Sequence, residues 1–485
     1  MRLDVVSDPL AELDADLVAL GLSDGQELPQ ELADVPGAGD VRTGFKKLTL
    51  LRPERPPRLL VVGLGKREEV DAERLRVAAA LVARRAGQHE ARSIAWALPA
   101  AGLDPAISAA ALVEGTTLAT YRFDRYRSRD PDDPPPPDLE GLTISADEAD
   151  RAGIEREAEV ARIASEAANR ARELQDLPAN ELTPAGLADR AEQVAGAHES
   201  VTAEVLGREQ IIARGMGGLA AVSAGSAQEP RLISLRYAGG DGETIGLVGK
   251  AVTFDTGGIS IKPSSGMHEM KMDMSGGAAV IEAVAAIAEL GLPINVVAAI
   301  PATENMPSGT ATRPGDIITQ LSGKTVEVND TDAEGRLILA DALTHCVREL
   351  GADRLVDLAT LTGAVVVALG STYAGLISND DAWAQRVQAA AERSGELAWR
   401  LPLHPEYKQL TKGTVADLAN VAPKRKAGTI YAASFLEEFV DGKPWAHLDI
   451  AGTSWDVGRE YVGKGATGFG VRLLVSLARD LAEPI

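Results

Sequence analysis

The sequence from residue 177 onward alternates short apolar runs with longer runs of helical character, and this alternation limits the folds open to the chain. Strands are expected at residues 244–248, 294–300, 325–328 and 354–357, and helices at residues 278–290 and 335–350. Such alternation is typical of a mostly parallel sheet with helices on both faces. Ligands of α/β folds bind beyond the carboxyl ends of the strands. Functional side chains are therefore expected in the segments after the strands, where Lys250, Asp255 and Asp332 fall.

Two domains are expected, because 485 residues are more than one hydrophobic core normally organises. The first, residues 1–153, begins with a buried strand at residues 58–65 and an alanine-rich helix at residues 70–86. A long amphipathic helix over residues 154–176 would connect it to the second domain, residues 177–485. The predicted fold class is α/β, with two α/β domains, of which the C-terminal one holds the mostly parallel sheet.

Two segments of the first domain stand out by their prolines and glycines. Four successive prolines within residues 129–141 can join neither a helix nor a sheet ladder, so an exposed loop is expected there. Gly63 and Gly65 end the first predicted strand and invite comparison with a nucleotide-binding turn. The third glycine of the dinucleotide fingerprint is missing, so we expect a glycine turn that binds no nucleotide.

Composition narrows the class of protein. The chain carries 71 acidic and 49 basic side chains, and the net charge of -22 disfavours binding to nucleic acid and to anionic membranes. The single cysteine, Cys346, excludes an intramolecular disulfide and a cysteine-based zinc site, fits a reducing compartment, and is expected on a buried helix face. Charges close to Met1 argue against a signal peptide, and the most apolar stretch, residues 355–370, is too short for a membrane span. A cytoplasmic protein is expected.

Two polar constellations carry the chemistry of the second domain. One is NDTDAEGRL at residues 329–337, and the other consists of residues 249–263 followed by residues 270–277. Together they contain four carboxylates and three cationic side chains: Asp255, Asp273, Asp332, Glu334, Lys250, Lys262 and Arg336. An isolated pair of acids usually begins a helix or lies in a solvated turn. Two such constellations in one domain instead predict a functional site.

Four carboxylates in one small cleft repel each other strongly and need cations. Two divalent metal ions would neutralise them if Lys250 binds as an uncharged amine. A water that bridges two metals roughly 3.5 to 4 Å apart becomes a hydroxide-like nucleophile, and Lys262 is then free to stabilise the oxyanion. Arg336 lies at the beginning of a predicted helix, whose free N–H groups favour a small anion. These parts predict metal-assisted hydrolysis.

Both constellations match, in order and spacing, the catalytic core of the leucyl aminopeptidase family, the dinuclear-metal exopeptidases also called cytosol aminopeptidases, which this chain resembles. The resemblance continues through residues 180–184, 357–364, 447–453 and 465–470, and more loosely through residues 62–66 and 121–126 of the first domain. It implies hydrolysis of the N-terminal peptide bond of peptides. It also implies a homohexamer whose active sites open to an interior cavity.

The resemblance assigns roles to individual residues. One metal would be held by Asp255, Asp332 and Glu334, and the other by Lys250, Asp255, Asp273 and Glu334. Manganese or zinc is expected, although magnesium and cobalt suit such ligands too. Arg336 would hold a bicarbonate that serves as general base, since neither constellation contains a histidine in its motif. Four residues would line an apolar pocket for the first side chain, favouring leucine or methionine: Met270, Thr360, Gly363 and Ala451.

Two departures from the family pattern and three rival interpretations remain at this point. The family usually has asparagine where this chain has Asp330, and glycine where it has Ala251. A dinuclear phosphoesterase would tolerate the carboxylates, but such sites more often include histidine. Some members of the family also bind DNA, which here would require a basic surface, for instance one repeated by symmetry from Lys46, Lys47, Arg52, Arg55 and Arg58. The third rival interpretation is an inactive scaffold, and the one observation in its favour is the aspartate at position 330.

Overall fold

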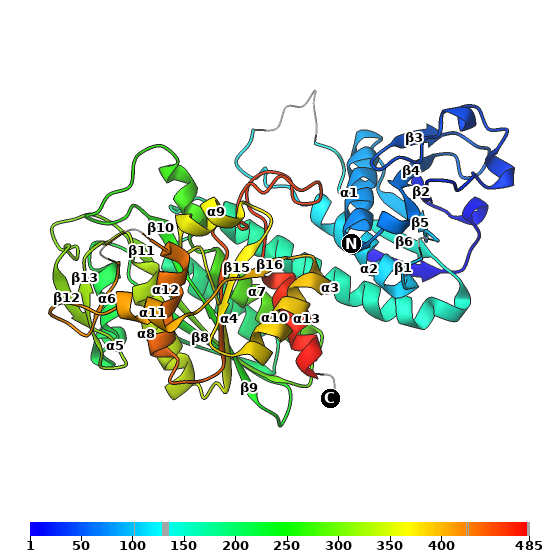
Figure 1. Cartoon of the computed structure of the whole chain (residues 1–485). Helices are drawn as coiled ribbons and strands as arrows, with labels where there is room; N and C mark the ends of the chain where they lie inside the picture. The colour runs from blue at the N-terminus through cyan, green and yellow to red at the C-terminus, as the bar shows by residue number, and fades with distance from the viewer. Residues whose placement is uncertain (101, 129–134, 423, 425, 483–485) are drawn as a thin grey trace. The chain divides into compact units, whose positions relative to one another are not determined.

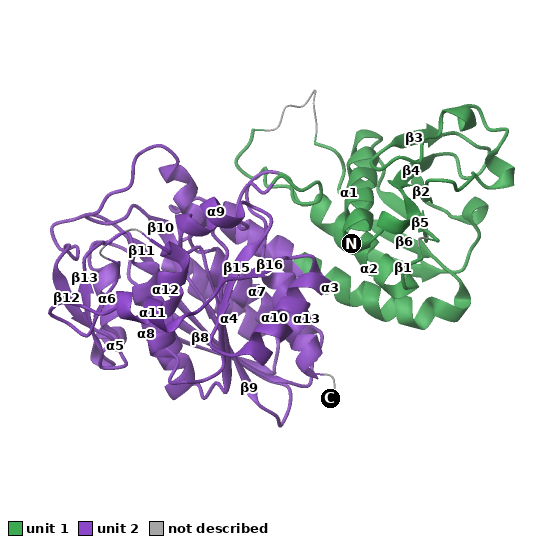
Figure 2. Cartoon of the chain, in the orientation of Figure 1, with its two compact units in different colours: residues 1–166, 458–463 green, residues 167–457, 464–485 purple. Residues whose placement is uncertain are grey.

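The computed structural model describes the chain apart from residues 101, 129–134, 423, 425 and 483–485 (Figure 1). The chain forms two compact units (Figure 2): Met1–Glu166 with Gly458–Gly463, and Ala167–Val457 with Lys464–Ile485. Helix α3 (Arg151–Asp176) passes from the first unit into the second. The division at residues 153 and 176 stays a prediction.

Unit 1 is built on a six-stranded sheet in the order β1-β6-β5-β2-β4-β3. Its strands are β1 (Arg2–Val6), β2 (Leu17–Ser23), β3 (Leu48–Leu51), β4 (Leu59–Gly65), β5 (Ser93–Ala97) and β6 (Gly141–Ser145). All neighbours are parallel except β3, which is antiparallel to β4. Helices α1 (Ala72–Gln88) and α2 (Pro105–Ala119) pack against each other and share a core with the sheet.

The structure describes the glycine turn of unit 1 fully and the proline-rich segment only in part. A Cβ on Gly63 would lie 2.2 Å from the carbonyl oxygen of Gly44, so close backbone packing requires this glycine. Gly65 has a φ of 78°, in the left-handed region that favours glycine. Both glycines thus have structural reasons for their place. Of the predicted loop at residues 129–141, residues 129–134 lie outside the described part, and residues 135–140 form neither a helix nor a strand.

Unit 2 contains a nine-stranded sheet in which β16, β15, β18, β14, β9, β11, β8 and β7 follow each other, and β10 pairs with β11. The strands are β7 (Val201–Leu206), β8 (Arg231–Ala238), β9 (Thr244–Gly249), β10 (Ala251–Asp255), β11 (Asn295–Asn305), β14 (Arg354–Ala359), β15 (Ala374–Ser378), β16 (Ala398–Arg400) and β18 (Trp445–Asp449). Five of these pairings are parallel and three are antiparallel. The predicted mostly parallel sheet is confirmed.

Helices cover both faces of this sheet, as predicted (Figure 1). One face carries α4 (Pro184–Ala197), α7 (Ser275–Glu289), α10 (Asp381–Ser394) and α13 (Val471–Ala482). The other carries α6 (Gly217–Ser223), α8 (Gly335–Arg348) and α12 (Gly428–Leu436). Shorter elements complete the unit: α5 (Arg208–Ala213), α9 (Gly363–Leu369), α11 (Pro405–Leu410), and the small sheet of β12 (Asp316–Thr319), β13 (Thr325–Val328) and β17 (Leu418–Ala419). Cys346 is buried on α8, as expected.

Two strands differ from expectation in ways that matter for the site. β11 continues past its expected end at residue 300 through Pro301 to Asn305, because its last residues pair with β10. β10 itself was not predicted as a strand, since its short sequence AVTFD lies inside the polar constellation. Helix α7 approaches the sheet closely there, because a Cβ on Gly276 would lie 2.1 Å from the carbonyl oxygen of Leu358. The carboxyl ends of β9, β10, β11 and β14 therefore share one crowded edge.

Candidate metal centre

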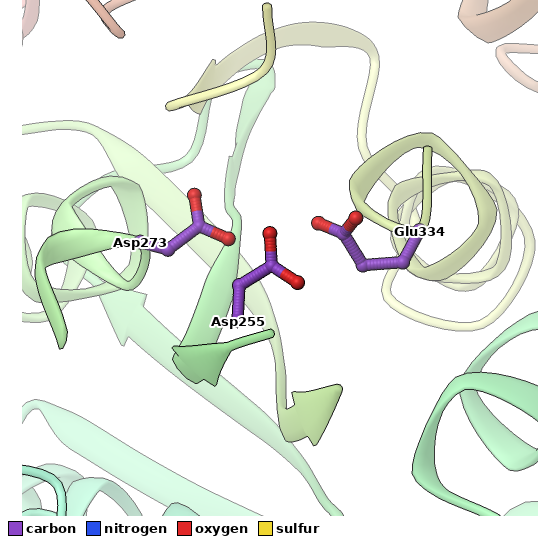
Figure 3. Close-up of side chains that lie close together, drawn as sticks. All are labelled: Asp255, Asp273 and Glu334. Carbon is purple, nitrogen blue, oxygen red and sulfur yellow. The ribbon is translucent and has the colours of Figure 1, made fainter. Parts of the chain in front are cut away.

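Three buried carboxylates meet at this edge of the sheet (Figure 3). Asp255 is the last residue of β10, Asp273 follows the 3-10 turn η6 (Met267–Met272), and Glu334 caps the beginning of α8. Each offers one oxygen, and these oxygens lie within 4.8 Å of one another. The three side chains come from separate segments and point toward a common centre (Figure 3). The arrangement brings together most of the predicted metal ligands.

Lys250 lies between two of these carboxylates. It directly follows β9, its side chain is 3% exposed, and its Nζ lies 2.7 Å from Asp273 Oδ2 and 2.8 Å from Glu334 Oε1. The Nζ also donates a hydrogen bond of 3.0 Å to the carbonyl oxygen of Thr360. A Cβ on Gly335 would lie 2.8 Å from Lys250 Cε, so the absence of a side chain there makes room for the lysine.

Lys262 bridges the more exposed side of the cluster. Its Nζ lies 2.9 Å from Asp255 Oδ2 and 2.5 Å from Asp332 Oδ1. The side chains of Lys262 and Asp332 are 22% and 35% exposed, whereas that of Asp255 is 3% exposed. The ion pairs of all four predicted carboxylates and both predicted lysines thus form two adjacent triads, one centred on Lys250 and the other on Lys262.

Burial and the proximity of like charges shift the pKa values of these side chains. Burial, helped by the charges of Asp255 and Glu334, raises the pKa of Asp273 to about 8. Burial likewise raises the pKa of Glu334 and of Asp332. Burial lowers the pKa of the Lys250 ammonium, but the Asp273 and Glu334 carboxylates raise it by more, so that it lies above its ordinary value. The carboxylates thus keep Lys250 charged in this ion-paired arrangement, and the neutral amine expected when it binds metal stays a prediction.

The donor set fits divalent metal ions. If every group is ionised, four carboxylates and two ammonium groups leave an excess of two negative charges in a largely buried site. A buried excess of like charge is costly unless a cation neutralises it. The two ammonium groups occupy positions between carboxylate oxygens, as a bound cation would. Oxygen and amine donors of this kind suit manganese, zinc, magnesium and cobalt.

Arg336 lies in the first turn of α8, close in sequence to the cluster. Its side chain is buried, its Nη1 donates a hydrogen bond of 2.6 Å to the carbonyl oxygen of Asn420, and its guanidinium lies over the Tyr431 ring, 5.6 Å from the ring centre. Its Nε has no hydrogen-bond partner within the described part of the chain. Burial lowers the pKa of Arg336, although an arginine retains its charge at neutral pH.

The four residues predicted to line a pocket lie in η6 and in segments that follow β14 and β18. Thr360 contacts the cluster directly, because its hydroxyl donates a hydrogen bond of 2.7 Å to Asp273 Oδ1. Met270 belongs to η6, Gly363 begins α9, and the N–H of Ala451 donates to Asp449. Their role as a pocket stays a prediction.

The two departures from the family pattern have simple local structures. Asp330 Oδ1 accepts a hydrogen bond of 3.0 Å from the N–H of Asp332, and an asparagine oxygen at that place would accept the same bond. Ala251 is buried at the beginning of β10, and its Cβ lies 2.7 Å from where a Cβ on Gly277 would be. The glycine of α7 therefore leaves room for the alanine methyl group.

Two buried asparagines that sequence analysis missed support the cluster. Asn305, at the end of β11, donates hydrogen bonds to Asp255 Oδ1 at 2.8 Å and to the carbonyl oxygen of Thr331 at 3.0 Å. Asn420, which follows β17, contacts the turn that holds Asp332. The one signal that could have revealed Asn305 is that it is a polar residue at the carboxyl end of a buried strand. Nothing in the sequence near Asn420 indicated its place.

The comparison with known families gives matches in both units. The model of the cytosol aminopeptidase family, catalytic domain, matches residues 169–475, and the model of that family's N-terminal domain matches residues 32–130. A probable cytosol aminopeptidase from Roseiflexus castenholzii is 47% identical, and the alignment covers 100% of both chains. A second, from Solibacter usitatus, is 45% identical over 99% of both chains.

Two solved structures have the same fold. The bottromycin maturation enzyme BotP in complex with Mn matches with a TM-score of 0.88 and 38% identity, over 97% of this chain and 100% of that one. A mutant of tomato leucine aminopeptidase matches with a TM-score of 0.86 and 32% identity, over 99% of this chain and 96% of that one.

Proposed function

Because this chain belongs to the cytosol aminopeptidase family and is a metal-dependent aminopeptidase, we propose that it removes leucine and other apolar residues from the N-termini of peptides. Membership in the family decides against the phosphoesterase interpretation. The observation that carries the proposal is the convergence of Asp255, Asp273 and Glu334 on one centre (Figure 3). The preference for apolar residues rests on the assignment of Met270 and Ala451 to the pocket.

Two divalent metal ions per subunit are proposed to bind at this centre. Asp255, Asp332 and Glu334 would hold one ion. Asp255 and Glu334 would also hold the other, together with Lys250 and Asp273. Manganese is the first choice, since the similar enzyme BotP is a complex with Mn, and zinc is the second. Lys250 must give up its proton to become a ligand, and the metal then replaces its ammonium group as the partner of the carboxylates.

When bound, two such ions supply an activated water and polarise the substrate carbonyl. Lys262 supplies a fixed positive charge. Burial lowers the pKa of its ammonium, but the nearby carboxylates, Asp255 first, raise it by more, so that Lys262 remains protonated at neutral pH. Its partial exposure places this charge at the open side of the cluster. We assign Lys262 the role of stabilising the negative charge that develops on the carbonyl oxygen.

Arg336 is proposed to hold a bicarbonate that accepts a proton during hydrolysis. Its guanidinium is buried and charged, and its Nε makes no hydrogen bond to the described residues. It also lies in the first turn of α8, whose free N–H groups favour an anion. A small planar anion would accept hydrogen bonds from Arg336 Nε and from the free N–H groups of α8. The positive charge of Arg336 would hold such an anion next to Glu334 without a further protein base.

A homohexamer in the cytoplasm is proposed as the working form. Helix α9 presents apolar side chains to solvent, and Val367 is 90% exposed and Val366 41% exposed. Burial of these side chains between subunits would remove their apolar surface from water. Within the described residues, no helix is long and apolar enough to cross a membrane. The names of the relatives include the word cytosol, which agrees with the proposed location.

The test is hydrolysis of leucine p-nitroanilide by the purified protein, after chelation and after addition of manganese or zinc. We expect activity that is lost on chelation and restored by metal. The N-acetylated leucine analogue is the control, because it lacks the free amino group and should not be cleaved. Cleavage of both substrates, or of neither with any metal, would contradict the proposed function.

A further inference from the structure

Asn420 lies outside both constellations, yet it is fully buried next to the turn that carries Asp332. It directly follows β17, a strand of two residues that pairs with β13. The backbone N–H of Asn420 donates a hydrogen bond of 3.0 Å to the carbonyl oxygen of Glu327. The short strand thus holds the asparagine beside the chain that leads from β13 to α8.

The side-chain amide of Asn420 spans this turn from its beginning to its end. Its Oδ1 accepts hydrogen bonds from the N–H of Asn329 at 2.8 Å and from the N–H of Asp330 at 3.3 Å. Its Nδ2 donates to the carbonyl oxygens of Asp330 at 2.6 Å and Ala333 at 3.3 Å. The amide therefore ties together the backbone on both sides of Asp332 and directly before Glu334.

The main chain of Asn420 reaches the third functional residue of the segment. Its carbonyl oxygen accepts the hydrogen bond of 2.6 Å from Arg336 Nη1. One residue thereby contacts the turn that holds Asp332 and also the guanidinium of Arg336. These contacts link two parts of the site that are also connected through the first turn of α8.

We propose that Asn420 is a positioning residue, which fixes Asp332 and Glu334 for metal binding and Arg336 for its anion. This inference rests on the proposed function of those three residues. Asn420 itself touches neither metal nor substrate. Residues that orient metal ligands from behind typically contribute 10–100-fold to metal affinity or activity.

The chemistry of the turn requires an asparagine. Two backbone N–H groups need an acceptor and two carbonyl oxygens need a donor, and an amide supplies both from one planar group. This pattern also determines which end of the Asn420 amide is oxygen. An aspartate of the same shape would keep the acceptor but place an oxygen against the carbonyl oxygens of Asp330 and Ala333. Alanine would leave all four backbone groups without their partner.

The experiment compares Asn420→Asp and Asn420→Ala with the wild type. The affinity of the metal-free protein for Mn²⁺ is measured by isothermal titration calorimetry, and kcat, KM and the Tm of the metal-free form are measured in parallel. Ser378→Ala is the matched control. Ser378 is also buried, bonds to backbone groups of Asp380 and Trp445, and lies at the end of β15 away from the site.

We expect both Asn420 variants to bind Mn²⁺ about 10–100-fold more weakly and to lose kcat by a similar factor, with little change in KM. Asn420→Asp preserves the shape of the side chain, so it tests the proposal even if Asn420→Ala does not fold. Ser378→Ala should lower the Tm and leave Mn²⁺ affinity unchanged. Mn²⁺ affinity within twofold of wild type in Asn420→Asp, with a decrease in Tm like that of Ser378→Ala, would overturn the proposal.

Metal binding separates this proposal from the proposed function. If the wild type binds Mn²⁺ but does not cleave leucine p-nitroanilide, the proposed function fails, and the Mn²⁺ affinities still decide the role of Asn420. If the wild type does both and the Asn420→Asp protein does both equally well, the positioning role alone fails.

Discussion

Metal binding at the centre should release protons. The number released should depend on pH, because the ion pair of Lys250 and Asp273 determines how many protons the metal-free site holds. Lys250 has a pKa above its ordinary value of 10.5, so it carries a full proton at pH 7 and must lose it to become a ligand. Asp273 lies 2.7 Å from this ammonium and has its pKa raised to about 8, so the pair holds more protons at pH 7 than at pH 9. Binding at the site formed by these residues should therefore release more than about one proton at pH 7 and about one at pH 9.

The sign of the pH dependence follows from the proton count. The metal-free protein holds more protons than the metal-bound protein, so metal affinity must rise with pH. The rise should be steeper than about tenfold per pH unit near pH 7 and about tenfold per unit near pH 9, where about one proton is released. The steeper dependence ends as pH rises through the pKa of Asp273 at about 8.

The assay is calorimetric titration of the metal-free protein with Mn²⁺ in several buffers of different ionisation enthalpy, at pH 7 and pH 9. Asp273→Asn should release about one proton at both pH values, because only the Lys250 proton remains. Asp441→Asn is the control, since Asp441 pairs with Arg348 on α8 and should leave the proton count unchanged. A release below about half a proton at pH 7, or the same release at pH 7 and pH 9 in the wild type, would refute the reasoning.

Three substitutions test individual roles. Lys262→Ala should lower kcat by about 100- to 1,000-fold while metal content, measured by atomic emission, stays that of the wild type; loss of metal would contradict its assignment to the oxyanion. Asp255→Ala should lose bound metal together with activity, because it is assigned to both ions, and retention of two ions would remove it from the ligand set. Asp330→Asn should keep the hydrogen bond from the N–H of Asp332, so its Tm should equal that of the wild type. The lost negative charge should change kcat/KM across the pH profile by less than about tenfold. Identical profiles would mean that the charge of Asp330 has no effect on activity.

The candidate site residues that could be predicted from the sequence share one kind of sequence environment. Lys250, Asp255 and Glu334 stand in glycine-flanked segments beside apolar runs, so charged residues there are conspicuous. The α/β pattern placed those segments at one edge of the sheet, which is where the structure has them. The charge state of Lys250 without metal could not be predicted from the sequence, because its pKa depends on which carboxylates surround it, and neither Asp273 nor Glu334 is near it in sequence.

Other parts of the site have no pattern that periodicity could reveal. β10 was missed because its five residues contain a threonine and an aspartate and are followed by a glycine pair. β11 was cut short at residue 300, because Pro301 resembles a strand end until its pairing partners are known. Asn420 is nearly a hundred residues from the turn it holds, with separations of 87 to 91 residues to its partners. Single asparagines acquire such roles only through tertiary structure.

The two lysines of the cluster bear on how an ion would enter it. Because Lys250 and Lys262 stand between the carboxylates, the chain itself neutralises half of the charge of the four acidic side chains. An ion that binds as proposed would therefore compete with side chains of the same chain for these oxygens. The ion acquired would follow the supply that the protein meets, since oxygen and amine donors suit manganese, zinc, magnesium and cobalt alike.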